Sequence, residues 1–277
     1  MINIQSKIEH KELKQNGYSI HYFCSGDSTK DLLIFLHPAF ADHRCFDKQI
    51  DYFSKDFRII TLDMLGHGLS KVDKAKDKID ATISHIDTIM RLEGYDKAHI
   101  VGVSMGSLIA QYYGLKYPEK VISMIILGGY NINADNREIT KAQRSEQIKW
   151  IFKALFSMNS FRKYVANVSV AYTEEQVRFY EMSKMFTRKS FMIMSGLGKV
   201  LQKRDGIVSH YPLLIMSGEK DLELAKKSSK KWHESDSNSK YSMIENSGHC
   251  ANMDNPDVFN ELLMDFIKQN TAYFKPF

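Results

Sequence analysis

Short apolar runs rich in β-branched residues recur along the chain, and segments with helical spacing separate them. This alternation is typical of parallel strands joined by helical crossovers, because the chain must be carried back across the sheet before each new strand. Several runs are apolar throughout, as expected for strands covered on both faces. The sequence therefore predicts an α/β protein with a mostly parallel central sheet flanked by helices. The expected strands are Tyr18 to Cys24, Leu32 to His37, Arg58 to Asp63, His99 to Val103, Val121 to Leu127, Pro212 to Ser217 and Tyr241 to Glu245, the first of which also fits an antiparallel edge strand.

One long segment, from Asn131 to Asp205, interrupts this rhythm and contains no convincing strand. Its apolar residues fall at helical spacing, so we expect a helical cap at residues 131–205, inserted into a core formed by residues 1–130 and 206–277. The apolar positions that set this spacing are Ile148, Ile151, Phe152, Leu155 and Phe156. The helices expected in the core are Cys45 to Ser54, Ile79 to Leu92, Met105 to Lys116, Leu222 to Glu234 and Pro256 to Gln269.

Composition narrows the class of protein further. Hydrophobic residues make up 43% and charged residues 26% of the 277, the balance of a soluble globular protein with a large core. The net charge of +5 comes from lysines scattered among carboxylates, so we expect no nucleic-acid partner. Three cysteines without metal or redox spacing, no signal-peptide pattern and no membrane-spanning run together favour a cytoplasmic protein.

The motif that carries chemistry is Gly102-Val103-Ser104-Met105-Gly106, between an expected strand and an expected helix. A serine on so sharp a turn adopts a strained backbone, and glycines on both sides remove the Cβ atoms that would clash there. The turn projects the hydroxyl group above the sheet, which makes Ser104 the candidate nucleophile.

Serine needs a base to take its proton, and the base needs a carboxylate that fixes its tautomer. His249 is the best candidate base, because it lies in a turn between the last expected strand and the C-terminal helix. Asp221 is the preferred acid, because its loop has cleared the preceding strand before it turns toward the histidine. The competing carboxylates are Glu219, Asp254 and Asp257.

With these residues in place, the chain resembles the α/β-hydrolase fold superfamily, in the branch with a helical cap, from about Leu32 to Ile267. The chain order serine, acid, histidine is that of this superfamily. Three further segments carry the resemblance: Leu36-His37-Pro38-Ala39-Phe40, Asp63-Met64-Leu65-Gly66-His67-Gly68-Leu69-Ser70, and the acid loop from Gly218 to Asp221.

The resemblance implies an oxyanion hole made of two backbone N–H groups, one after the nucleophile and one in the turn after the third strand. Here these would belong to Met105 and Ala39. Pro38 stands where the family usually has glycine, and proline has no N–H to donate, so Phe40 is the fallback donor.

The expected reaction is hydrolysis of a carboxylic ester, or a thioester, through an acyl-enzyme, with no metal or organic cofactor. The serine at the elbow argues against epoxide hydrolases and haloalkane dehalogenases, relatives that use an aspartate there. The same triad also serves carbon-carbon bond hydrolysis, lyase chemistry and cofactor-free perhydrolysis. A different class of function is a small-molecule receptor that keeps the triad, and the cap could offer a homodimer surface.

The cap is rich in methionine and aromatic residues, most of which we expect to pack it onto the core. The remainder would form an adaptable apolar wall over Ser104, which predicts a substrate with a hydrophobic portion. Four polar residues near the motifs are expected to have structural roles: His37 and His67 in bracing loops, Cys250 in the core, and Ser107 in the elbow helix, pointing away from the substrate. The cap residues concerned are Trp150, Phe156, Met158, Phe161, Met182, Met185, Phe186, Met192 and Met194.

Overall fold

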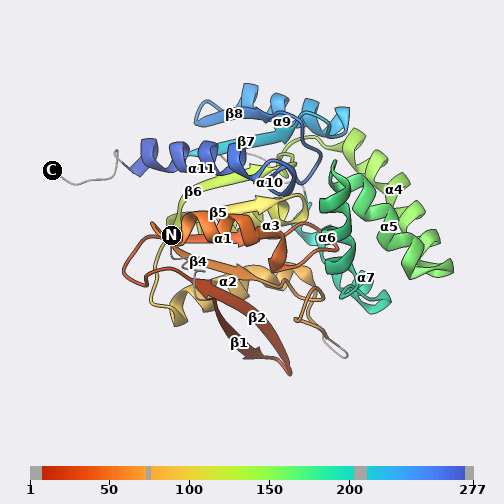
Figure 1. The fold of residues 1–277 in the computed structure, drawn as a ribbon, viewed down its shortest axis with the longest axis horizontal. Coiled ribbons are helices and arrows are strands. Elements are labelled where there is room, and N and C mark those ends of the chain that lie inside the picture. Colours follow the sequence, from red (N-terminus) through yellow and green to blue (C-terminus); the bar gives the residue numbers. More distant parts are fainter. Residues whose placement is uncertain (1–7, 73–75, 203–210, 272–277) are drawn as a thin grey trace.

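An eight-stranded sheet forms the centre of the molecule, in the order β1-β2-β4-β3-β5-β6-β7-β8 (Figure 1). The structure is a computed structural model, and it describes residues 8–72, 76–202 and 211–271. Strands β3 to β8 all run parallel to one another, which confirms the predicted α/β fold. The strands are β1 (Glu9–Gln15), β2 (Tyr18–Ser25), β3 (Leu32–Leu36), β4 (Arg58–Leu62), β5 (Ala98–Val103), β6 (Val121–Leu127), β7 (Leu213–Gly218) and β8 (Ser239–Ile244).

Strand β1 was not expected from the sequence. It is mostly charged, and Leu13 is its one buried residue, so it gives no apolar run. It forms because Asn16 and Gly17 both adopt positive φ, the geometry of a tight hairpin turn that pairs β1 antiparallel with β2. Strand β2, the first strand expected from the sequence, is antiparallel to β4 as well. It therefore lies inside the sheet, and the edge strand is β1.

Apolar side chains of the central strands alternate between two cores, one on each face of the sheet. In β3, Leu32, Ile34 and Leu36 enter one core, whereas Leu33 and Phe35 enter the other. The first core is covered by α2 (Thr82–Leu92), α3 (Met105–Lys116) and α9 (Glu223–Ser235), and the second by α1 (Asp47–Phe53) and α11 (Pro256–Thr271) (Figure 1). The five helices expected in the core are thus present, two of them preceded by short 3₁₀ turns.

Between β6 and β7 the described chain contains helices and no strand, as expected for residues 131–202. Phe161, Phe179 and Phe186 are fully buried among these helices and tie them to the core. The expected domain boundary at residue 205 lies outside the described residues, and the division into core and cap remains a prediction. The helices are α4 (Arg137–Phe156), α5 (Met158–Ser169), α6 (Thr173–Ser183), α7 (Arg188–Met194) and α8 (Leu197–Val200).

None of the helices in the described ranges combines the length with the apolar character that a membrane-spanning segment needs.

Candidate active site

Ser104 lies at the junction of β5 and α3 with φ of 53° and ψ of −114°, a region that residues with a side chain rarely occupy. Its backbone N–H donates to the carbonyl of Leu127 at the end of β6. The two glycines have the role expected of them. A Cβ at Gly102 would lie 2.5 Å from the carbonyl oxygen of Gly106, and one at Gly106 would lie 2.1 Å from that of Leu36.

The three predicted residues come together at the carboxyl ends of the strands. The Ser104 hydroxyl lies 2.7 Å from Nε2 of His249, and Nδ1 of His249 lies 2.9 Å and 3.0 Å from the two carboxylate oxygens of Asp221. Asp221 follows β7, and His249 lies between β8 and the short helix α10 (Ala251–Asp254). The arrangement places the Nδ1 proton on the Asp221 side and leaves Nε2 free to accept the serine proton.

Electrostatics in this group favour a basic imidazole. Burial alone would lower the pKa of His249, but the Asp221 carboxylate and its hydrogen bonds raise it above the ordinary value. Burial alone would raise the pKa of Asp221, but His249 and the backbone N–H of Leu222 hold it below its usual range. The His249 side chain is 24% exposed, so the site is not sealed from solvent.

Two of the three competing carboxylates stabilise the histidine loop. Glu219 accepts a hydrogen bond from the backbone N–H of Asn246, and Asp254 accepts one from Gly248. Asp254 also accepts from the N–H of Ala171, which ties the loop to the segment between α5 and α6. Asp257 lies in the first turn of α11 and is exposed. The sequence contained no signal for the two bracing roles, because both depend on backbone groups brought close by folding.

The proposed oxyanion donors flank this group. Met105 is the first residue of α3, so its N–H belongs to those that a helix leaves without an intrahelical acceptor. Because Gly106 lies directly against the carbonyl of Leu36, the elbow and the turn carrying Ala39 are close together. Phe40, the fallback donor, has a positive φ of 70°.

His37 fixes the shape of that turn. Its Nε2 accepts from the N–H of Met64, so Nδ1 carries the proton and donates to the carbonyl of Pro38. The Pro38 carbonyl also accepts from the N–H of Ala41, and the turn is thereby closed without the usual glycine. His37 therefore braces two loops, as its position in the sequence indicated.

Three other residues near the motifs also have structural surroundings. The His67 ring is fully buried, with its centroid 5.1 Å from those of His37 and Phe186. Ser107 donates to the carbonyl of Ser104, and Cys250 is completely buried, which raises the pKa of its thiol well above the ordinary value.

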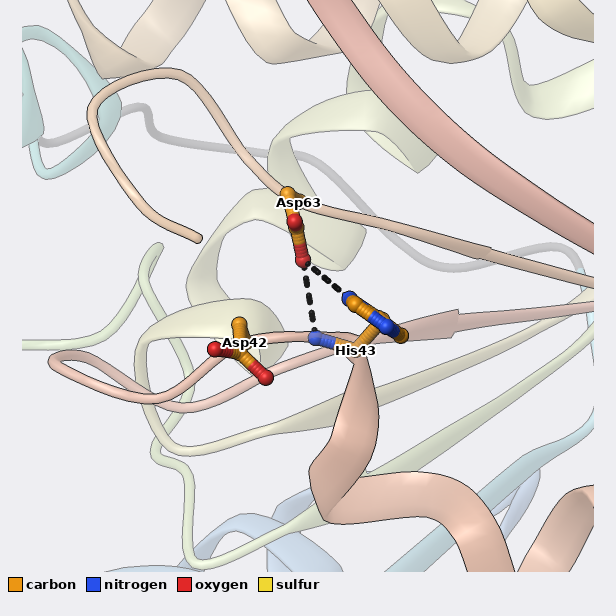
Figure 2. A group of neighbouring side chains, drawn as sticks. All are labelled: Asp42, His43 and Asp63. Carbon is orange, nitrogen blue, oxygen red and sulfur yellow. Dashed lines mark hydrogen bonds and ion pairs between the residues drawn. The ribbon is translucent and has the colours of Figure 1, made fainter. Parts of the chain in front are cut away.

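A side-chain group with metal-ligand character lies beside the active-site loops, namely Asp42, His43 and Asp63 (Figure 2). One Asp63 oxygen accepts from the backbone N–H and the ring of His43, and the other accepts from Leu69. The Asp42 carboxylate is paired with the guanidinium of Arg44. Because protein donors already engage these oxygens, the group fits a loop brace better than a cation site.

Phe40 is the centre of an aromatic cluster that joins helices α4 and α5 to the core. Its ring packs edge-on against Trp150 of α4, Phe161 of α5 and Phe186, at centroid distances of 5.0 to 5.2 Å. Of the methionine and aromatic residues expected in this segment, most are at least partly buried, whereas Phe156 and Met192 are exposed and belong to the minority that does not pack. The sequence identified Phe40 only as a backbone donor, because its ring contacts depend on how α4 and α5 pack against the turn.

Comparisons with known proteins agree with this fold. A family model described as the alpha/beta hydrolase fold matches residues 31–161. Human epoxide hydrolase 4 is 23% identical, over 94% of this chain and 78% of its own, and human monoacylglycerol lipase ABHD6 is 23% identical, over 96% and 83%. A carboxylesterase structure from Nitrososphaera gargenis superposes with a TM-score of 0.77 at 18% identity, over 95% of this chain and 99% of the other.

The chain therefore has the α/β-hydrolase fold, and the relatives it matches are hydrolases of that superfamily. Its relatives act on different bonds, so the reaction has to be argued from the site.

Proposed function

We propose that the protein hydrolyses a carboxylic ester, or a thioester, that has a hydrophobic portion. The observation that carries the proposal is the 2.7 Å contact between the Ser104 hydroxyl and Nε2 of His249, continued by the Asp221 carboxylate on the other side of the ring. A serine hydrogen-bonded to a base that a third group orients is the arrangement of an activated nucleophile.

In the first half of the reaction Ser104 Oγ attacks the acyl carbon while His249 takes the hydroxyl proton. The oxyanion of the tetrahedral intermediate is held by the N–H groups of Met105 and Ala39, and loss of one such donor costs about 3 kcal/mol of transition-state stabilisation. The intermediate collapses to the acyl-enzyme, and the imidazolium gives its proton to the departing alcohol or thiol.

In the second half water attacks the acyl-enzyme and His249 takes its proton. Collapse of the second intermediate returns that proton to Ser104 and releases the carboxylic acid. Asp221 stabilises the imidazolium in both halves and is not itself protonated. No step requires a metal or an organic cofactor.

The residue at the elbow and the surroundings of Phe40 support this choice of substrate. The sequence relatives include epoxide hydrolases, but the resemblance implies an aspartate nucleophile for those enzymes, whereas this chain has Ser104. The hydrophobic portion is supported by the aromatic rings of Phe40, Trp150 and Phe161, which meet beside the turn carrying Ala39. Apolar walls with a few placed polar groups are typical of small-molecule sites.

The activated serine can be tested by mass spectrometry of the intact protein after exposure to a fluorophosphonate. We expect a single adduct on Ser104 of the wild-type protein and no adduct on Ser104→Ala or His249→Ala. Ser228→Ala, on the outer helix α9, is the matched control and should label as the wild type does. A folded wild-type protein that takes no adduct would contradict the proposal and favour the receptor function.

The bond that is cleaved can be tested with a panel containing neutral esters, thioesters, a β-diketone, and peroxide with halide. Turnover of neutral apolar esters or thioesters is the expected result. Turnover of the diketone alone would replace the proposal with carbon-carbon bond hydrolysis, and halide oxidation alone with perhydrolysis. A preference for strongly charged esters over neutral ones would remove the argument for an apolar substrate.

A further inference from the structure

The outer face of α4 exposes a stripe of large apolar side chains. Its five members fall at positions i, i+3, i+4, i+7 and i+8 and so share one side of the helix, and they are between 49% and 86% exposed. In Figure 1, α4 and α5 lie at the side of the molecule opposite the C-terminal end of α11. Isolated apolar residues on a surface need no explanation, but a contiguous group marks a contact site. The stripe consists of Ile148, Ile151, Phe152, Leu155 and Phe156.

The opposite side of α4 is already packed, so the stripe is not a face that the fold has failed to bury. Ala154 is buried, and Trp150 packs edge-on against Phe40 of the core. Arg188 donates to the carbonyls of Ala154 and Leu155 at the C-terminal end of the helix. The helix is therefore fixed to the molecule with its apolar stripe directed outward.

Basic residues continue the stripe toward the beginning of the helix. Arg137, Lys141 and Arg144 follow the same spacing of three and four residues that leads to Ile148, and all three are exposed. The complete helix has five basic residues and two acidic ones, Glu138 and Glu146. Glu146 is engaged by Lys149 and by the hydroxyl of Tyr164. The outward face is thus basic in its first half and apolar in its second.

We infer that this face of α4 binds an anionic lipid surface. Large apolar side chains that enter a bilayer interface and cations that contact its anionic headgroups both contribute to binding. On α4 the two kinds follow one another along the same side, so its C-terminal half would insert and its N-terminal half would contact the headgroups. With its charged residues spread along its whole length, α4 lies on the bilayer and does not span it.

A second copy of the chain fits the face less well. If two α4 helices packed side by side in parallel, their basic halves would lie against each other. If they packed antiparallel, the basic half of each would lie against the apolar half of the other. Neither arrangement sets carboxylates opposite Lys141 and Arg144, whereas a surface of anionic headgroups does supply negative charge there.

The inference is tested by co-sedimentation of the full chain with vesicles of phosphatidylcholine alone and of phosphatidylcholine with phosphatidylglycerol in equal parts. We expect binding to the anionic vesicles, weak binding to the neutral ones, and a loss of binding as salt is raised. The double variant Phe152→Ser, Phe156→Ser should have an affinity for the anionic vesicles at least about tenfold lower than that of the wild type, because two inserted rings are removed. Lys141→Gln with Arg144→Gln should also weaken this binding.

Leu92→Ser is the matched control. Leu92 is also an exposed apolar residue at the end of a helix, 61% exposed, but it belongs to α2 and not to the proposed lipid-binding face of α4. It should bind as the wild type does, and so should Ser104→Ala, which separates lipid binding from the proposed reaction. Fluorophosphonate labelling in solution verifies that each α4 variant is folded. Absence of vesicle binding would overturn the inference, and so would equal binding by the wild type and the double phenylalanine variant. If the wild type binds no vesicles but forms a dimer, and the double variant is a monomer, the face is a contact between copies of the chain.

Discussion

At the scale of single residues, the backbone of Ser104 is the most constrained feature of the site. A positive φ at a residue with a side chain costs on the order of 1–3 kcal/mol and persists only where the surroundings impose it. Here they are the two elbow glycines and the hydrogen bond to the Leu127 carbonyl. The role of the two glycines could be predicted from the sequence, because a side chain at either position would clash in so sharp a turn. The hydrogen bond to Leu127 could not be predicted, because it depends on how β6 lies beside β5.

The Asp221 carboxylate is expected to control both the rate and the pH dependence of the reaction. Asp221→Asn should lower kcat by about 10⁴, because the imidazole loses its orientation and the partner of its charged form. Only neutral His249 can accept the serine proton, so activity is lost as the pH falls through its pKa, which Asp221 raises. Without the carboxylate, burial dominates and the acid limb of kcat/KM should move to lower pH.

Glu219→Gln is the control for this prediction, because Glu219 belongs to the same loop but binds the backbone of Asn246. Its kcat should stay near that of the wild type, with an unshifted acid limb. A larger loss of rate in Glu219→Gln than in Asp221→Asn would reverse the assignment of the acid.

At the scale of elements, the position of α3 against the end of β3 brings the proposed oxyanion donors together. Gly106→Ala should lower the free energy of unfolding by at least about 2 kcal/mol, because the new Cβ meets backbone that has no room to move. That Cβ would lie 2.1 Å from the Leu36 carbonyl oxygen and 2.8 Å from that of His37. Fluorophosphonate labelling should be slowed as well, since α3 must shift away from the turn of Ala39. Urea unfolding and labelling rates check the two effects.

The matched substitution is Gly198→Ala in α8, where a Cβ meets no atom within 4 Å. It should be neutral or stabilising by up to about 1 kcal/mol, because alanine restricts the unfolded chain more than glycine does. Equal stability of the Gly106 and Gly198 variants would show that the close approach of α3 to β3 is not maintained in solution.

Elements also differ in how far they could be predicted. Strands β3 to β7 could be predicted from their apolar runs, because strands buried on both faces consist mostly of apolar residues. Strand β1 was not predicted, because its sequence is mostly charged and its pairing depends on the turn at Asn16 and Gly17. Helix α4 was predicted from spacing, but the outward direction of its apolar stripe depends on which side meets the core.

At the scale of the whole molecule, four histidines of the described residues are buried where a charge is poorly solvated, and burial lowers the pKa of each, His37 included. Burial lowers the pKa of His67 to about 3, and those of His85 and His99 to about 4. In the unfolded chain each takes up a proton near the ordinary histidine pKa of 6.5, so below that pH the unfolded state binds more protons than the folded state. The fold must therefore lose stability as the pH falls from 6.5 toward 4.

His99→Gln should reduce this loss. His99 lies on β5 and contacts the Ser123 hydroxyl on β6, a contact that an amide can replace. Between pH 6.5 and about 4, the dependence of the free energy of unfolding on pH should become shallower by about 1.4 kcal/mol per pH unit, one proton's share. Urea unfolding across this range measures both slopes, and identical slopes would mean that His99 is protonated in the folded protein.

The sequence by itself determined the α/β fold, the elbow at Ser104 and the chain order that leads to Asp221 and His249. These follow from local physics: strand and helix periodicities, glycines where a Cβ cannot fit, and the turns that end strands of a parallel sheet. The tertiary structure alone decided how the Pro38 turn is closed by His37, which carboxylates brace the histidine loop, and which side of α4 faces outward. Each of those depends on groups far apart in the chain, and no local pattern encodes which of them will meet.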